Sequence, residues 1–323
     1  MATPSSSERS HLSRTEVVLV SYRSRSHVEQ LVDGWPADLS VVVVDNAGDV
    51  DGLAGFSASH PNVRYLDGGG QGFGRAANLG ALSSSKEFIV FVNPDCRPTA
   101  ADLEALVAGV AADAGAVSHA ATMTGHDGSI ESGVGGWEPS LRRLTVHALG
   151  LGSVLRHAGL FASPKPGEHC DVDWTTGACM AVRADRFREF GGFDESFYVY
   201  AEDVSFGRSA RLAGLRTVLR EDVLVRHGSG SSGAPSLEML RLRGASFAGY
   251  LTRYHRSRAW PMRGLMVVGA LVRGLAAALR GRRDVAAQQW AFIVGTVTMT
   301  AHVGGQEVAA RRLAEVTGSA QPS

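Results

Sequence analysis

Residues 86–100, KEFIVFVNPDCRPTA, contain a short apolar run that ends in an amide, a proline and a carboxylate. The run, residues 88–92, is too short for a helix and too apolar for a surface loop, so it predicts a buried strand. Pro94 ends the strand because proline has no N–H to donate to a sheet ladder. Asp95 is therefore expected just beyond a central strand, where open α/β sheets bind their ligands.

A second interpretation is that Asp95 only caps the helix that follows. Thr99, followed by the acids Asp102 and Glu104, already has the residue type preferred at a helix start. Both interpretations stay open at this point, and Asp95 needs partners before it indicates a ligand.

Strand and helix patterns alternate along the chain around this run. Strands that are apolar on both faces must be covered by helices, so the βαβ-type alternation predicts an α/β fold with a mostly parallel sheet. The expected strands are 15–22, 39–48, 62–67, 88–92, 114–121 and 179–182, and the expected helices are 26–35, 72–85, 100–113, 184–190 and 202–213.

Composition describes an ordinary globular protein. Of its 323 residues 44% are hydrophobic and 20% charged, which excludes a disordered chain. Cys96, Cys170 and Cys179 are odd in number and lack C-x-x-C spacing, so they indicate neither a disulfide framework nor a zinc cluster. Residues 1–14 contain no apolar signal segment and are expected to be a disordered lead-in, which favours a cytoplasmic protein.

Two further regions are expected around the α/β domain of residues 15–235. Within it, residues 121–172 are rich in glycine and proline, and a helix is expected at 141–158. We interpret this segment as an insertion that forms one side of the ligand-binding site. Residues 236–323 form a helical extension with 12 Lys+Arg against 4 Asp+Glu, whereas the rest of the chain has 20 against 28. Such asymmetry favours an anionic partner for the extension.

The apolar stretches of the extension are interrupted. Arg273 divides the first, and the second has 14 residues, short of the roughly 20 that span a bilayer. Amphipathic helices lying on an anionic membrane surface are therefore predicted. The alternative is a helical hairpin that packs on the catalytic domain or forms a dimer interface.

Acidic residues follow several of the predicted strands. Asp45 ends one, Asp95 follows another, and Asp203, with Glu202 before it, begins a helix. Convergent carboxylates attract a divalent cation, which in turn binds a diphosphate, while a further carboxylate can accept a proton. The alternative for Glu202 and Asp203 is a pair of acids favoured by a helix N-terminus.

A glycine cluster at residues 72–77 matches GxGxxA, a dinucleotide-binding fingerprint. That fingerprint belongs in the first strand-to-helix turn. Here the first turn, SYRSRSH, has no glycine. A nucleotide-sugar or NAD(P)-dependent oxidoreductase is therefore the disfavoured alternative.

Several segments together resemble family 2 glycosyltransferases of the GT-A fold, close to the bacterial rhamnosyltransferases. The resemblance covers residues 15 to about 230 and depends on the order and spacing of the segments. These are VSY, VVVVDNAG, GFGRAANLG, FVNPD, TGACMAVRADRFREFGGFDESFYVYAED and VRHGSG.

The resemblance implies roles for individual residues. The donor-binding residues would be Ser21, Tyr22, Asp45, Asn46, Gly74, Asn78, Asn93 and Asp95. The acceptor side would be formed by Trp174, Thr176, Gly177 and Glu202. Asp203, the second acid of the ED element, would be the catalytic base, although Ser205 stands where the family often has a further acid.

The segment from Asn93 to Asp95 is similar to the family's DxD element, whose last acid contacts metal and diphosphate. Asn93 replaces the first acid, so metal binding is expected to be weaker or to use other ligands. His227 matches a late histidine that faces the metal or diphosphate. The alternative for His227 is a hydrogen bond beneath a loop.

By resemblance, the protein is an inverting glycosyltransferase that uses Mg²⁺ or Mn²⁺ and a nucleotide diphosphate sugar, with dTDP-rhamnose favoured. The acceptor would be a hydroxyl of a glycan or polyprenyl-diphosphate-linked glycan in cell-wall or surface polysaccharide synthesis. The enzyme would lie peripherally at the inner face of the cell membrane. No nucleic-acid partner is expected, and both a monomer and a homodimer stay open. A non-catalytic assembly protein of the same fold is disfavoured because Asp95 and Asp203 are both present.

Overall fold

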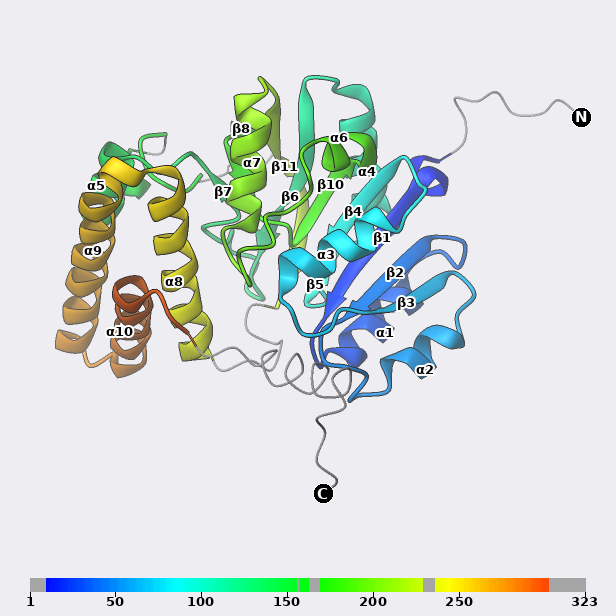
Figure 1. Cartoon of the computed structure of the whole chain (residues 1–323), viewed down its shortest axis with the longest axis horizontal. Helices are drawn as coiled ribbons and strands as arrows, with labels where there is room; N and C mark the ends of the chain where they lie inside the picture. Colours follow the sequence, from blue (N-terminus) through cyan, green and yellow to red (C-terminus); the bar gives the residue numbers. More distant parts are fainter. Residues whose placement is uncertain (1–9, 156, 163–168, 229–235, 302–323) are drawn as a thin grey trace, which may run out of the picture.

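The computed structural model describes residues 10–155, 157–162, 169–228 and 236–301 (Figure 1). In these residues a nine-stranded mixed sheet has the order β3-β2-β1-β4-β10-β6-β11-β5, and β8 pairs with β11. The expected lead-in, up to residue 9, lies outside the described residues.

The first four strands of this order are all parallel. β10 runs antiparallel to both β4 and β6, and β11 is parallel to β6. Strand β10 follows the insertion and not a crossover helix, so its direction is not constrained to be parallel. The strands are β1 (Thr15–Ser21), β2 (Ser40–Asp45), β3 (Val63–Asp67), β4 (Phe88–Val92), β6 (Ala116–Thr124), β10 (Cys179–Arg183) and β11 (Arg216–His227).

Helices cover both faces of the sheet, as expected from strands that are apolar on both faces. Alternate residues of β4 enter opposite cores: Val90 packs with α1 and α4, whereas Phe91 packs with α3, α6 and α7. The helices are α1 (Arg25–Gly34), α2 (Leu53–Ala58), α3 (Phe73–Leu82), α4 (Ala100–Ala112), α6 (Ala184–Glu189) and α7 (Glu202–Leu212). The predicted α/β fold with flanking helices is confirmed.

Three elements differ from the sequence expectation. The six-residue α2 and the twelve-residue β11 were not expected; β11 carries charged residues between its apolar ones and escapes a search for apolar runs. The helix expected at 141–158 is shorter, α5 (Leu141–Ala148), followed by a 3-10 turn at Leu151–Ser153. Gly150 separates them in a left-handed conformation with φ 70°.

Helix α4 has its own cap. The Thr99 hydroxyl accepts a hydrogen bond from the Asp102 amide at 3.2 Å, and the Asp102 carboxylate accepts one from the Thr99 amide at 2.8 Å. This capping box satisfies the helix start, so Asp95 does not cap α4.

The insertion contributes short strands to the rim of the sheet. β8 (His169–Val172) pairs with β11, β5 (Cys96–Arg97) pairs with the end of β11, and β7 (Gly135–Gly136) pairs with β9 (Trp174–Thr175). The β5 pairing places Cys96 beside His227 at the C-terminal end of β11, whereas β7 and β9 form a separate two-stranded sheet.

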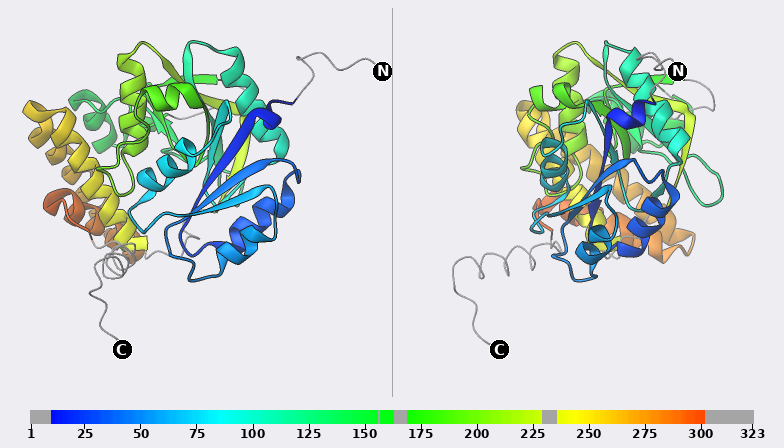
Figure 2. Two further views of the ribbon diagram at one scale, coloured as in Figure 1. Left: turned by 45° about the vertical axis from the view of Figure 1, so that its right-hand side comes forward. Right: turned by 90° about the vertical axis from the view of Figure 1, so that its right-hand side faces the viewer.

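The described part of the extension, residues 236–301, forms three helices that lie together at the end of the molecule remote from β1, β2 and β3 (Figures 1 and 2). They are α8 (Ser236–Tyr254), α9 (Ala259–Leu279) and α10 (Arg283–Thr298). α8 and α10 cross closely at two glycines: a Cβ on Gly295 would lie 1.8 Å from the Arg241 carbonyl oxygen, and one on Gly244 would lie 2.3 Å from that of Phe292.

Helix α8 is packed on the catalytic domain. Tyr250 is fully buried, and its hydroxyl donates to the Glu138 carboxylate of the insertion at 2.9 Å. The same carboxylate pairs with His255 at 2.9 Å and with Arg208 of α7 at 2.6 Å. Of the two interpretations of the extension, packing on the catalytic domain therefore applies to α8.

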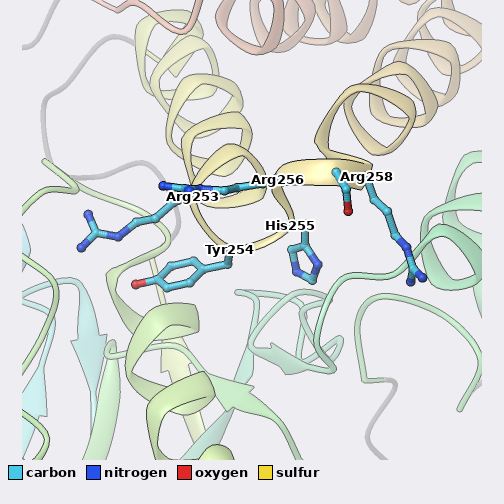
Figure 3. Close-up of a pocket in the computed structure, with 6 residues that line it drawn as sticks. Arg253, Tyr254, His255, Arg256 and Arg258 are labelled. Carbon is cyan, nitrogen blue, oxygen red and sulfur yellow. The ribbon is translucent and has the colours of Figure 1, made fainter.

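The turn between α8 and α9 borders an open hollow of about 470 Å³ that is not the site of the predicted carboxylates (Figure 3). Tyr254 and His255 point from this turn toward α7 and the insertion (Figure 3). Tyr254 bonds the Ser205 hydroxyl at 2.7 Å, so these side chains anchor the turn. The six lining residues are Arg253, Tyr254, His255, Arg256, Ser257 and Arg258.

Helix α9 contains a long apolar stretch. In the part of the chain that the structure describes, the segment Arg256–Leu279 is long and apolar enough to cross a membrane, with a mean hydropathy of 1.6 and 28% of that window buried. A core helix can pass the same test, so length and hydropathy alone establish no span.

Replacing Glu138 should loosen the attachment of α8. Glu138→Ala leaves the buried Tyr250 hydroxyl and the Arg208 guanidinium without their acceptor, so we expect a loss of about 1–3 kcal/mol in the free energy of unfolding. The measurement is urea unfolding at pH 7. Glu189→Ala, which breaks an exposed pair with Arg186 on α6, is the control and should change stability by less than about 0.5 kcal/mol.

Burial acts to raise the pKa of Glu138, but hydrogen bonds from His255 and Tyr250 and the Arg208 charge outweigh it and lower this pKa. A depressed carboxyl pKa contributes stability above the unfolded value, so the difference between wild type and variant should shrink as pH falls below about 4. An equal difference at pH 7 and pH 3 would contradict this role.

Candidate active site

The predicted acids lie along one edge of the sheet, and three of them converge on Tyr200. Burial raises the pKa of the Tyr200 hydroxyl; Arg243 opposes this rise, and the carboxylates of Glu202, Asp95 and Asp203 add to it. Asp45, at the end of β2, lies two strands away from β4 along the same edge. The site therefore has a carboxylate centre around Tyr200 and a separate acid at the β1–β2 end.

The backbone before α7 is held in a strained conformation. Tyr200 and Ala201 are consecutive left-handed residues with φ 66° and 77°, and each such non-glycine residue costs on the order of 1–3 kcal/mol. Hydrogen bonds hold the preceding residues from two sides: Phe73 donates its amide to the Tyr198 carbonyl at 2.7 Å, and the Ser246 hydroxyl donates to the Val199 carbonyl at 2.7 Å.

Gly72 makes the first of these contacts possible. Its φ is 102°, and a Cβ at this position would lie 2.2 Å from the Tyr198 carbonyl oxygen. The glycine cluster thus serves a close approach between α3 and the segment before α7, and not the first turn of a dinucleotide fold.

The paired acids at the start of α7 have different protonation. Glu202 is 4% exposed, and its Oε2 has no hydrogen-bond partner among the described residues. Burial and the neighbouring Asp203 raise the pKa of Glu202 well above its usual value. Burial also raises the pKa of Asp203, to about 6, while the Val204 amide that donates to its carboxylate at 2.7 Å limits the rise. Burial and the closeness of the two acids thus oppose the ionisation of both at once.

Asp95 forms a charged chain with two other side chains. His227 Nε2 lies 3.4 Å from the Asp95 carboxylate, and His227 Nδ1 lies 2.9 Å from that of Glu131. Burial lowers the pKa of His227, but the hydrogen bonds and charges of Asp95 and Glu131 outweigh it and raise this pKa to about 9. Sequence reasoning missed Glu131, which stands in the weakly patterned segment GSIESG.

This cluster suits a divalent cation. Ligand atoms of Asp95, Cys96 and His227 lie within 4.8 Å of one another. Burial raises the pKa of the Cys96 thiol well above its usual value, which disfavours the thiolate, and the raised pKa of His227 likewise means that its ring must lose a proton before it can bind a metal. Carboxylate and imidazole remain, a set suited to Mn²⁺, whereas Mg²⁺ prefers oxygen alone.

Two orphaned polar atoms mark the β1–β2 end of the site. The buried Ser21 Oγ and Asn46 Oδ1 have no hydrogen-bond partner among the described residues, although Asn46 Nδ2 donates to the Gly72 carbonyl at 3.0 Å. Buried polar atoms without partners are rare, and a ligand is one explanation. Tyr22 follows Ser21 at the end of β1 and is partly exposed.

Asp45 shapes the adjoining loop. Its fully buried carboxylate accepts hydrogen bonds from the amides of Ala47 and Asp49 at 2.7 and 2.6 Å, and from the Tyr65 hydroxyl at 3.1 Å. Burial raises the pKa of Asp45 despite these bonds. Its carboxylate lies close to those of Asp49 and Asp51; acids gathered in this way do not by themselves identify a ligand.

Asn78 and Gly74, which are both predicted to bind the donor, also make contacts within the protein. Asn78 is buried; its amide donates to the Phe193 carbonyl and the Glu195 carboxylate and accepts from the Phe193 amide. These bonds give Asn78 a role in supporting that loop. Gly74 of α3 lies against Glu202, since a Cβ added at Gly74 would lie 3.4 Å from Glu202 Cβ. The lack of a side chain at Gly74 therefore lets α3 come close to Glu202 and Asp203.

The predicted acceptor wall adjoins the end of β4. Asn93 donates its amide to the Ala178 carbonyl at 2.7 Å, which ties the turn before Asp95 to this wall. Thr176 bonds Val134 of the insertion at 2.9 Å, and Gly177 lies against two phenylalanine rings. Trp174 is buried, and its indole donates to the Trp137 carbonyl at 3.4 Å.

Residues 18–159 match the family "Glycosyl transferase family 2". They include the β1–β2 end with its unpartnered atoms, the glycine cluster and the turn with Asp95, whereas His227 and the acid pair of α7 lie beyond the matched residues.

The chain is a glycosyltransferase, and its residues 18–159 match family 2.

Sequence relatives agree with this assignment. N-acetylglucosaminyl-diphospho-decaprenol L-rhamnosyltransferase of Mycobacterium tuberculosis is 28% identical over 267 residues, which cover 75% of this chain and 81% of the relative. Rhamnosyltransferase WbbL of Escherichia coli is 26% identical over 213 residues, covering 62% of this chain and 78% of the relative. The oxidoreductase and non-catalytic alternatives are therefore set aside.

A solved structure shares the fold. Mannosyltransferase PcManGT from Pyrobaculum calidifontis, in complex with GDP-Man and Mn²⁺, matches with a TM-score of 0.56 at 17% identity, over 88% of this chain and 86% of that one. The GT-A fold predicted from the sequence is confirmed.

This glycosyltransferase has a further charged residue at its carboxylate centre. Arg243 of α8 lies with its guanidinium carbon 5.9 Å from the centre of the Tyr200 ring. Sequence reasoning assigned its helix to the basic extension and missed it, because only the packing of α8 brings residue 243 to the site.

Proposed function

We propose that this glycosyltransferase moves rhamnose from a nucleotide diphosphate donor, dTDP-rhamnose, to a hydroxyl of a lipid-diphosphate-linked glycan, with inversion at the anomeric carbon. The observation that carries the proposal is that the carboxylates of Asp203 and Asp95 both act on Tyr200, while Asp95 is linked through His227 to Glu131. The relatives named for rhamnosyl transfer, one of them to a decaprenyl-diphosphate-linked N-acetylglucosamine, support the donor and acceptor class.

The proposed step is a single displacement. Asp203 takes the proton of the acceptor hydroxyl as the oxygen attacks the anomeric carbon and forms the new C–O bond. The bond from that carbon to the diphosphate oxygen breaks, and the departing nucleoside diphosphate keeps the electron pair. Glu202, protonated and buried behind Asp203, limits the negative charge at this end of the site.

The donor is proposed to lie along the sheet edge. Ser21, Tyr22 and Asn46 would contact the nucleoside, because two of them have unpartnered buried atoms there, while Asp45 shapes the loop between them. Asn93 and Asp95 would face the diphosphate at the end of β4.

Asp95 and His227, with Glu131 beside them, would hold a divalent cation. When bound, the cation neutralises charge that develops on the leaving diphosphate. The imidazole favours Mn²⁺ over Mg²⁺ at this position. Asn93 lacks the negative charge of the acid that the family has at this position. The carboxylate of Glu131 would supply that charge instead.

The acceptor is proposed to approach from the insertion side, along Trp174, Thr176 and Gly177. This wall adjoins Asp203 through α7, because Gly207 packs directly on Trp174. Entry from that side would place the acceptor hydroxyl opposite the diphosphate, as inversion requires.

We also propose a peripheral position at the cytoplasmic face of the cell membrane. The outer surface of α9 and α10 exposes large apolar side chains, among them Leu275 at 65% and Leu279 at 89% exposure, next to exposed arginines. Such a surface suits an anionic bilayer. The other apolar residues are Trp260, Val268, Val272 and Trp290, and the arginines are Arg256, Arg258, Arg280, Arg282 and Arg283.

Asp203→Asn should lower kcat by roughly 10²–10⁴-fold, because the amide cannot accept the proton. Since the base must be ionised, kcat/KM of the wild type should fall tenfold per pH unit below about 6 and level off above it. The measurement is steady-state transfer from pH 4.5 to 8.5, with donor affinity followed separately.

Glu202→Gln is the matched control and should retain most of the activity, because Glu202 is already protonated. If the Asp203→Asn enzyme kept more than about a tenth of wild-type kcat while Glu202→Gln was inactive, the wrong acid would have been chosen as base.

Asp95→Asn should remove the metal-dependent part of nucleotide binding. We expect the affinity for TDP in the presence of Mn²⁺ to fall by at least roughly tenfold, with little change in its absence. Titration calorimetry with and without Mn²⁺ measures both values. Asp185→Asn on the exposed surface of α6 is the control, and unchanged Mn²⁺-dependent binding by Asp95→Asn would refute the metal assignment.

Charging the outer face of α9 should release the protein from membranes. The double variant Leu275→Glu/Leu279→Glu should bind phosphatidylglycerol vesicles at least tenfold more weakly, since burying one leucine contributes about 1.5–3 kcal/mol. Vesicle co-sedimentation measures this, and TDP binding should stay unchanged. Leu212→Glu, on the exposed part of α7, is the control; equal vesicle binding by all three proteins would rule out this surface.

A further inference from the structure

Arg243 is a partly buried cation whose charge acts on Asp203 without a direct ion pair among the described residues. Among the residues that the structure describes, its guanidinium has neither an ion pair nor a hydrogen bond, and its contact is the face of the Tyr200 ring. Arg253, further along α8, instead pairs with Asp194 at 3.4 Å. An arginine held inside a site without an acceptor has its donors free for a ligand.

The surroundings of Arg243 belong to the acceptor half of the site. An ideal Cβ on Gly133 of the insertion would lie 3.4 Å from Arg243 Nη2. Burial raises the pKa of Asp203 and the Arg243 charge opposes this rise, while burial, Arg273 and Arg243 together lower the pKa of His147 on α5. Asp203, Tyr200, the insertion and α5 thus surround Arg243, whereas the orphaned atoms of the donor half lie at the β1–β2 end.

Helix α8 fixes this position. Three residues after Arg243, the Ser246 hydroxyl bonds the Val199 carbonyl at 2.7 Å; one turn later Tyr250 reaches Glu138. Residues at this spacing share one helix face, so the same face that anchors α8 presents Arg243 to Tyr200. The guanidinium is therefore held in place and not on a free surface arm.

We propose that Arg243 binds the phosphate group of the acceptor, so that the helical extension supplies part of the acceptor site beside Asp203. This rests on the proposed lipid-diphosphate acceptor. A guanidinium matches phosphate geometry with paired donors, and in a partly buried site such bonds are strong. An uncharged glycan offers no group that requires an arginine here, so Arg243 would select acceptors that carry a phosphate near the reacting sugar.

The test compares two synthetic acceptors with the same sugar and the same alkyl chain, one linked through a diphosphate and one through an uncharged glycosidic oxygen. Full-length Arg243→Met should raise KM for the diphosphate acceptor by roughly 10–100-fold, the loss expected for hydrogen bonds to a charged group. KM for the uncharged acceptor should change less than about threefold. Arg243→Lys should be intermediate. Arg253→Met, which loses the pair with Asp194, a hydrogen bond to Ser196 and a contact with the Tyr254 ring, should match wild type.

Three results would overturn the proposal. Equal changes with both acceptors would mean that Arg243 only supports the site. A matching loss of TDP affinity, with the acceptor KM unchanged, would assign it to the donor diphosphate.

The third result comes from binding alone, which separates this inference from the proposed function. With the nucleotide site saturated by TDP and Mn²⁺, the alkyl diphosphate acceptor should bind wild type more tightly than Arg243→Met, even if no sugar is transferred. Equal binding would refute the arginine site, whereas binding without transfer of rhamnose would refute only the proposed donor.

Discussion

The structure depends on the burial of two adjacent carboxylates at the start of α7. Burial raises the pKa values of both Glu202 and Asp203, which opposes the ionisation of both at once. They follow the strained residues Tyr200 and Ala201, and hydrogen bonds from α3 and α8 hold the two residues before these, Tyr198 and Val199. The glycosyltransferase thus stores backbone strain directly before its two buried acids.

The helical extension is part of the catalytic unit and also its most exposed apolar surface. Glu138 ties α8 to the insertion and to α7, and close glycine contacts bind α10 to α8. α9 is left with one face against the protein and another toward solvent. Acceptor binding and membrane contact would therefore involve one continuous helical unit, which suits a substrate whose sugar must reach the site while its lipid stays in the bilayer.

Most of the fold could be predicted from local sequence. Buried parallel strands are recognised by their apolar runs, as at Val41–Val44 and residues 88–92, and their direction follows from the helices between them. The acids at the strand ends were found for the same reason. What escaped were elements without such a pattern: the charged strand β11, the short α2, and the direction of β10, which depends on its neighbours β4 and β6.

The sequence by itself determined the α/β fold, the family, and the positions of Asp95 and Asp203, because these follow from residue order over short distances. Only the tertiary structure decided which groups surround them. Glu131 reaches His227 across 96 residues, and Arg243 reaches Tyr200 from a helix whose composition alone suggests a membrane surface. It also revealed that Asn78 supports the loop at Phe193 and that the pKa values of Glu202 and Asp203 are raised, since burial and neighbouring charge are properties of packing and not of the local chain.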